Sequence, residues 1–226
     1  MIKRYNEFYV NENRLQVLLL RMLKFYTYKT INGEAVELAL IEMGIDHQKV
    51  NVDLFAGEQR SAEFLKINPS GRIPCIEHEV NGDTTTVSQT GAILIYLAEF
   101  SGKFLPKDTA KKAKVLEYLF FQLTDISINV FNNFYLKSLI KPPHAEAAEV
   151  LKDRALSFYQ VFNERLQHHK YIAGNDISIA DFATFPVVHR LIDSEDIQKL
   201  EKLVQWHQTL CQRASIVSIY QLTTKS

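Results

Sequence analysis

The spacing of apolar positions changes near residue 106 of the 226-residue chain. Before that point, short apolar or alternating runs bounded by turn residues predict four β-strands and three helices. The strands are expected at residues 23–28, 50–54, 73–77 and 84–87. The helices are expected over about 36–43, within 57–67 and over 89–100. The order is βαβ followed by ββα, which predicts an α/β unit: a mixed four-stranded sheet with helices on both faces.

After Leu105-Pro106 the strand pattern does not recur, and apolar residues follow a helical period. One long helix is expected over about 110–139, ended by Pro142-Pro143 because proline cannot continue a helix interior. Further helices are expected over 145–168, from Ser178 onward and over 200–211. Ser178 and Asp181 have the spacing of a capping box, which we interpret as a folding element. The second half is therefore expected to be an all-helical bundle.

These patterns predict three parts of the chain: 1–21 as an extension, 22–105 as the α/β domain and 106–226 as the helical domain. The apolar run 17–20 is followed at once by Arg21, so it lacks the length of a secretory signal or a membrane span. We expect residues 1–21 to be mobile or to lie along the surface. Translation from Met22 is left open as an alternative to translation from Met1.

Composition narrows the classes of function. Lys plus Arg equals Asp plus Glu, so no basic field favours nucleic acid or a membrane surface as a partner. The two cysteines, Cys75 and Cys211, form no disulfide framework, and a reducing cytoplasm is the expected compartment. The seven histidines show no ligand spacing such as His-Glu-x-x-His, so no metal site is predicted.

Two stretches are expected to meet in space. Residues 71–76 form a loop that enters a buried strand through Ile73-Pro74, and residues 88–93 turn from a strand into a helix with polar residues at its start. Asn81-Gly82 between them is typical of a hairpin. Free backbone groups beside the proline and free N–H groups at the helix start favour a small, anionic, peptide-like ligand.

These same stretches carry a resemblance to a known family. Residues 68–74, Asn-Pro-Ser-Gly-Arg-Ile-Pro, and residues 89–99, which begin Gln-Thr-Gly-Ala-Ile, resemble the cytosolic glutathione transferase superfamily. The similarity runs from about Leu23 to about Val217. It implies a thioredoxin-like domain followed by a helical domain, glutathione as substrate without a metal, and a homodimer.

The resemblance also implies roles for individual residues. Pro74 is expected to be cis, with the backbone of Ile73 pairing with the cysteinyl part of glutathione. Gln89 and Thr90 are expected to hold its γ-glutamyl end. Arg72 either pairs with a carboxylate of the ligand or lies in solvent.

The loop after the first strand is where the family ionises the glutathione thiol. Lowering a thiol pKa from about 8.5 by two units requires about 2.7 kcal/mol of preferential anion stabilisation, which a hydroxyl donor and a helix N-terminus can supply. Thr30 and Asn32 lie there and resemble the Nu-class and fungal prion-like members, which reduce disulfides with glutathione. Ile31 stands where those members have proline.

Three other residues are alternatives for this chemistry. Tyr26 and Tyr28 could donate a phenol hydroxyl, although Tyr26 lies within the strand and Tyr28 at its end. Cys75 follows the proline on a buried strand and is expected to be core. The expected function is an enzyme that activates glutathione for conjugation to an electrophile or for disulfide or peroxide reduction. The alternative is a non-catalytic binding module on the same fold.

Overall fold

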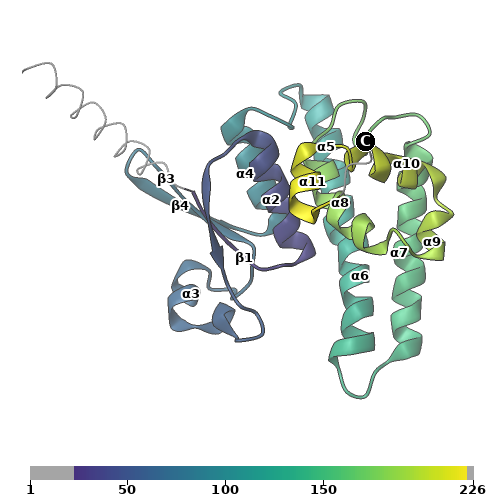
Figure 1. Ribbon diagram of the computed structural model, residues 1–226, viewed down its shortest axis with the longest axis horizontal. Coiled ribbons are helices and arrows are strands. Elements are labelled where there is room, and N and C mark those ends of the chain that lie inside the picture. The colour runs from purple at the N-terminus through teal and green to yellow at the C-terminus, as the bar shows by residue number, and fades with distance from the viewer. Residues whose placement is uncertain (1–22, 223–226) are drawn as a thin grey trace, which may run out of the picture.

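The computed structural model describes residues 23–222, and the prediction for residues 1–21 lies outside that range. Its first part is a four-stranded mixed sheet in the order β2-β1-β3-β4 (Figure 1). The strands are β1 (Leu23–Thr27), β2 (His47–Asn51), β3 (Cys75–Val80) and β4 (Asp83–Ser88). β1 pairs parallel with β2 and antiparallel with β3, and β3 pairs antiparallel with β4 through the predicted Asn81-Gly82 turn. The predicted thioredoxin-like arrangement is confirmed.

The second strand begins and ends earlier than the predicted 50–54. Pairing with β1 closes with the N–H of Val52, which donates to the carbonyl of Thr27 at 2.9 Å. Asp53 then accepts hydrogen bonds from the N–H groups of Phe55 and Ala56, so the chain turns there. The apolar residues after Asp53 therefore belong to a loop, and the strand itself is a largely exposed edge strand.

Side chains on the two faces of the sheet belong to different cores, as the period of two along a strand requires. Phe25 and Ile76 point toward α2 (Ile31–Met43) and α4 (Thr90–Ser101). Together with buried residues of the helical part, these side chains form one large hydrophobic core. Tyr26 and Cys75 point the other way and pack with Phe64 of α3 (Ala62–Ile67). Figure 1 shows α3 on the far side of the sheet from α2 and α4.

The second part of the chain, as far as residue 222, consists of helices and the loops that join them. Its elements are α5 (Thr109–Phe120), η2 (Phe121–Ile126), α6 (Ser127–Phe134), η3 (Tyr135–Leu139), α7 (Ala145–Arg165), α8 (Ile179–Leu191), α9 (Glu195–Gln198), α10 (Glu201–Leu210) and α11 (Ala214–Tyr220). The single helix predicted over 110–139 is one helical run containing two π-type segments, η2 and η3. The two short helices α9 and α11 were not predicted. The domain boundary at 105/106 stays a prediction and falls in the link between α4 and α5.

The capping box at Ser178 is formed, and it is part of a larger buried network. The Asp181 carboxylate accepts hydrogen bonds from the N–H and hydroxyl of Ser178, the N–H of Ile172 and the indole of Trp206. These contacts join the start of α8 to the 171–174 turn and to α10. The network supports the interpretation of this motif as a folding element.

Helix α2 joins the two parts of the molecule. Glu34 in its first turn accepts hydrogen bonds from Arg190 of α8 and from the hydroxyl of Tyr220 of α11. Glu42 in its last turn accepts from Arg213 and Ser215. Within residues 23–222, no helix has both the length and the apolar character needed to span a bilayer.

Candidate functional site

Three segments end in one row across the sheet. Tyr26 of β1 lies opposite Cys75 of β3, and Cys75 lies opposite Ser88 of β4. The next positions along these strands are Thr27, Pro74 and Gln89, which we call the strand-end row. The Ile73-Pro74 bond and the start of α4 are thereby brought together, as the sequence pattern predicted. The loop before α2 lies beside them, as the resemblance implied.

The loop before β3 is fixed by short-range hydrogen bonds. The Ile73-Pro74 peptide bond is cis, and the buried Asn68 side chain donates to the carbonyl of Arg72 at 2.7 Å. Gly71 has φ 59°, and a Cβ there would lie 2.9 Å from the carbonyl oxygen of Gln59, so a side chain is excluded. Ile73 is half-buried and the Arg72 side chain is exposed. The backbone of residue 73 is therefore held in place ahead of the sheet.

Thr30 is the N-cap of α2. Its backbone is extended, and its hydroxyl oxygen accepts a hydrogen bond from the N–H of Gly33 at 3.1 Å. Asn32 is exposed in the first turn of the same helix. Gly33 packs so closely on the end of β1 that a Cβ there would lie 2.3 Å from the hydroxyl of Thr27. The helix start is therefore pressed against the strand-end row, with Thr30 at its tip.

Gln89 has an unusual backbone conformation at the N-cap of α4. Its φ of 74° and ψ of 123° lie in a region that side-chain-bearing residues rarely adopt, at a cost of about 1–3 kcal/mol. Thr90 follows as the first helical residue and is 6% exposed. N–H groups in the first turn of a helix have no partners within the helix, so this end of α4 can receive an anion.

The alternative donors differ in their surroundings. The Tyr26 hydroxyl donates to Glu77, and burial together with that carboxylate raises the pKa of the phenol. Burial raises the pKa of the Cys75 thiol to about 11, with the Glu77 charge acting in the same direction. Tyr28 is half-buried with its ring edge against Phe55, and desolvation and then Asp53 raise the pKa of its phenol. Both Tyr26 and Cys75 are core residues, and the Cys75 thiol is protonated at neutral pH.

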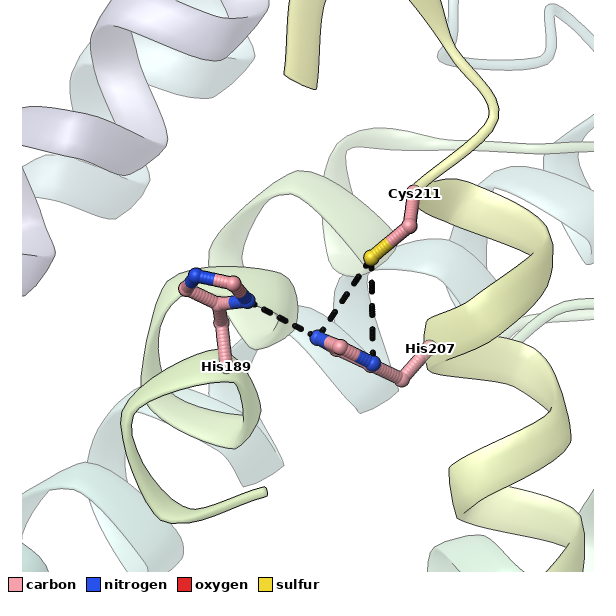
Figure 2. Close-up of side chains that lie close together, drawn as sticks. All are labelled: His189, His207 and Cys211. Atoms are coloured by element: carbon pink, nitrogen blue, oxygen red, sulfur yellow. Dashed lines mark hydrogen bonds between the residues drawn. The ribbon is translucent and has the colours of Figure 1, made fainter. Parts of the chain in front are cut away.

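A second group of chemically active side chains lies in the helical part. His189 at the end of α8, His207 in the last turn of α10 and Cys211 just after it converge, as Figure 2 shows. The sequence analysis predicted no metal ligands, and it did not indicate that these three side chains meet. The His207–Cys211 spacing of four, typical of one helix face, was the available signal. His189 is brought to it only by tertiary packing.

Comparison with known proteins gives a consistent result. The glutathione S-transferase N-terminal domain matches residues 22–99, and the glutathione S-transferase C-terminal domain matches residues 124–219. The chain is 31% identical to the disulfide-bond oxidoreductase YfcG of Escherichia coli, over 85% of this chain and 91% of that protein.

Two solved structures share both the fold and a comparable level of identity. A glutathione transferase homologue from Lodderomyces elongisporus, with two GSH per subunit, superposes with a TM-score of 0.82 at 30% identity, covering 91% of this chain and 100% of that one. A glutathione transferase from Burkholderia graminis, with two glutathione molecules per subunit, gives a TM-score of 0.83 at 25% identity, covering 91% and 90%. The matched domains, the shared fold and the sequence identity together show that the chain belongs to the glutathione S-transferase superfamily.

Proposed function

We propose that the protein is a glutathione-dependent enzyme that binds glutathione along the strand-end row and uses its thiolate to reduce disulfides. The observation that carries this proposal is the convergence of Thr30, the Ile73-Pro74 bond and Gln89-Thr90 at one end of the sheet. Each would supply a different chemical group to one ligand. Thr30 supplies a hydroxyl, Ile73 its backbone N–H and carbonyl, and Gln89-Thr90 the N-terminus of α4.

Glutathione would lie across this row as an extended peptide. The backbone N–H and carbonyl of Ile73 would pair with its cysteinyl residue, because Pro74 has no N–H and the β3 ladder begins only at Cys75. The N–H groups of α4 and the Thr90 hydroxyl would hold the γ-glutamyl carboxylate. The exposed Arg72 is within the same loop and would pair with the glycyl carboxylate.

The same arrangement can stabilise a thiolate. Thr30 accepts the Gly33 N–H with its oxygen, so its own hydrogen is available to the sulfur. A hydrogen bond to a charged group contributes about 1.5–3 kcal/mol and a helix N-terminus about 0.3–1 kcal/mol. Their sum includes the value of about 2.7 kcal/mol that is required to lower the thiol pKa to about 6.5. Asn32 offers a second donor from the exposed first turn.

The Escherichia coli relative named a disulfide-bond oxidoreductase favours disulfide reduction over conjugation, and the positions of the two cysteines determine how the electrons would be supplied. Cys75 is fully buried and Cys211 lies in the helical part, so neither cysteine of the chain is placed to act at the row. Two glutathione molecules must then supply both electrons. The first thiolate attacks the substrate disulfide and releases one thiol, and the second attacks the glutathione sulfur of the mixed disulfide, giving oxidised glutathione and the second thiol. The two glutathiones per subunit in the Burkholderia and Lodderomyces proteins and the name of the Escherichia coli relative support this order.

A second copy of the chain is the partner that the surface favours. Several large apolar side chains are exposed along the helical run from α5 to η3: Phe120, Ile128, Phe131, Phe134, Tyr135 and Leu139. Four of them recur at the spacing of one helix face and form what we call the apolar stripe: positions 128, 131, 135 and 139. We infer a homodimer that covers this stripe, in a cytoplasmic enzyme whose two cysteines stay reduced.

Calorimetric titration with reduced and then oxidised glutathione tests the proposal. We expect both to bind, and we expect Thr90→Val to weaken binding of reduced glutathione about 10- to 100-fold because one charged hydrogen bond is lost. Thr109→Val, at the exposed first position of α5, is the matched control and should bind normally.

Turnover then separates the two chemistries. The proposal predicts glutathione-dependent reduction of a small dialkyl disulfide that exceeds conjugation of a chloronitroaromatic electrophile. Conjugation without disulfide reduction would overturn the reductase assignment. Absence of binding at millimolar glutathione would overturn the enzyme and favour the non-catalytic module.

A further inference from the structure

His189, His207 and Cys211 converge between the ends of α8 and α10, in a part of the molecule that the glutathione chemistry does not use. The Nδ1 atom of His189 lies 2.9 Å from the Nε2 atom of His207. The Cys211 sulfur lies 3.7 Å from that same Nε2 atom. All three candidate ligand atoms fall within 4.8 Å of one another. In Figure 2 the Cys211 sulfur lies at similar distances from both nitrogens of His207, while His189 meets only the Nε2 atom.

We propose that these three side chains form a site for a single zinc ion, or another borderline-soft divalent transition metal. Two imidazole nitrogens and one thiolate are a zinc donor set that leaves a fourth position open. In the proposed site that fourth position is filled by water. The glutathione reaction itself requires no metal, so this site is a separate function of the helical part.

Two of the three ligand-pair distances are close to those that such an ion requires, and the third, between His189 and Cys211, lies within 4.8 Å. With metal–nitrogen bonds of about 2.05 Å and a metal–sulfur bond of about 2.3 Å, tetrahedral geometry places two nitrogens about 3.3 Å apart and nitrogen and sulfur about 3.6 Å apart. The His189–His207 pair at 2.9 Å must open by a few tenths of an ångström. The sulfur at 3.7 Å from Nε2 of His207 is already at the required separation.

The surroundings hold the rings in this arrangement. The His207 ring is 6% exposed and stacks on Phe185 with an interplanar angle of 4°. The His189 ring packs on Tyr220, with ring centroids 4.2 Å apart. These aromatic neighbours hold both rings in place, so metal binding requires the Cys211 sulfur to move toward the Nε2 end of the His207 ring.

The charges around the cluster also favour a cation. The carboxylate of Asp193 acts on both rings and that of Glu34 on His189, while Arg190 opposes them. Binding would convert the Cys211 thiol to a thiolate and release one proton to solvent.

Cobalt is the most direct probe, because a cobalt–thiolate bond gives a near-ultraviolet charge-transfer band. Tag-free full-length protein is stripped with a chelator and titrated with Co²⁺ and, in a calorimeter, with Zn²⁺. The proposal predicts one equivalent of metal per chain and a charge-transfer band that Zn²⁺ displaces.

Variants assign the ligands. Cys211→Ser should abolish the band, and His207→Gln or His189→Gln should weaken zinc binding by at least about 100-fold. His168→Gln, at an exposed histidine, is the matched control and should bind like the wild type. Far-ultraviolet circular dichroism confirms that each variant is folded, and the separate His189 and Cys211 variants keep the test valid if His207→Gln does not fold.

Two results would overturn the proposal. One is the absence of a charge-transfer band and of zinc binding in the stripped wild-type protein. The other is a band that persists in Cys211→Ser, because the metal would then be held elsewhere. In either case the three side chains form only a hydrogen-bonded contact between helices.

Discussion

The hydroxyl oxygen of Thr30 accepts a hydrogen bond from the N–H of Gly33 at 3.1 Å, so the residue closes the first turn of α2. An oxygen that accepts this bond still has its own hydrogen to donate. The structural role of the residue as a helix cap and its proposed role toward the glutathione sulfur are therefore compatible. Gly33, the partner in this contact, fixes how closely that hydroxyl approaches the strand-end row.

Gly33→Ala should destabilise the protein by about 1–3 kcal/mol. The added Cβ would lie 2.3 Å from the Thr27 hydroxyl and 2.6 Å from the Tyr28 carbonyl oxygen, so α2 must move away from β1. Urea unfolding at equilibrium measures the change. Gly174→Ala is the control, because a Cβ at residue 174 meets no atom within 4 Å. Equal stability of the two variants would show that the close approach of α2 is not required.

Gln89→Gly should stabilise the fold while weakening glutathione binding. Glycine relieves a φ of 74°, which is expected to contribute about 1–3 kcal/mol to the free energy of unfolding. The ligand loses the Gln89 side chain. Unfolding curves and glutathione titrations on the same preparation measure both effects.

Asn81→Gly provides the control for that experiment. Asn81 also has a positive φ, but it lies in the β3–β4 turn, and asparagine tolerates this conformation well. Its substitution should leave glutathione affinity unchanged. If Gln89→Gly also binds normally, the Gln89 side chain has no part in the site.

The sequence predicted this end of the sheet more completely than the rest of the molecule. Ile73-Pro74 and Gln89-Thr90 lie next to turn residues, where local chemistry limits the backbone, so the pattern indicated both the elements and their meeting point. The position of Thr30 beside them was implied by the resemblance to the glutathione transferase superfamily. The strand at His47–Asn51 was misplaced because it is an exposed edge strand with a weak apolar pattern. The π-type segments within 109–139 and the His189–His207 contact depend on packing between distant residues, which periodicity along the chain does not reveal.

Stability should fall below about pH 5 in part through Glu42. Burial opposes ionisation of this carboxyl, but hydrogen bonds from Arg213 and Ser215 and the Arg213 charge together hold the pKa of Glu42 below its usual value. A depressed pKa contributes stability above the unfolded-state value, near 4.3, and that contribution is lost as the pH falls through the folded-state value.

Glu42→Gln tests this linkage. The variant should be less stable than the wild type by about 1–3 kcal/mol at pH 7, because charged hydrogen bonds between α2 and the start of α11 are lost. The difference should shrink as the pH is lowered toward 3. Urea unfolding at several pH values measures it, and a difference independent of pH would contradict the assigned role of Glu42.

Phe131→Glu should convert the inferred dimer to a monomer. The side chain is 56% exposed in the isolated chain and lies in the middle of the apolar stripe, so a charge there would be buried without a partner in the dimer. Sedimentation velocity at micromolar concentration measures the change. Phe55→Glu, at a 92% exposed side chain in the β2–α3 loop, is the control for oligomeric state and should sediment like the wild type. A wild-type protein that sediments only as a monomer would exclude the dimer.

The most direct test of the central claim is the pKa of the bound glutathione thiol. It is measured from the thiolate absorbance of the complex as the pH is varied. The account predicts a pKa near 6.5 in the wild type, about two units below that of a free thiol. Thr30→Ser, which keeps the hydroxyl, should preserve it. Thr30→Ala should raise it by at least about one unit, and Thr30→Asp should also raise it, because aspartate caps the helix but has no hydrogen to donate at neutral pH. A wild-type pKa near 8.5, or a value unchanged in Thr30→Ala, would contradict thiolate activation by Thr30.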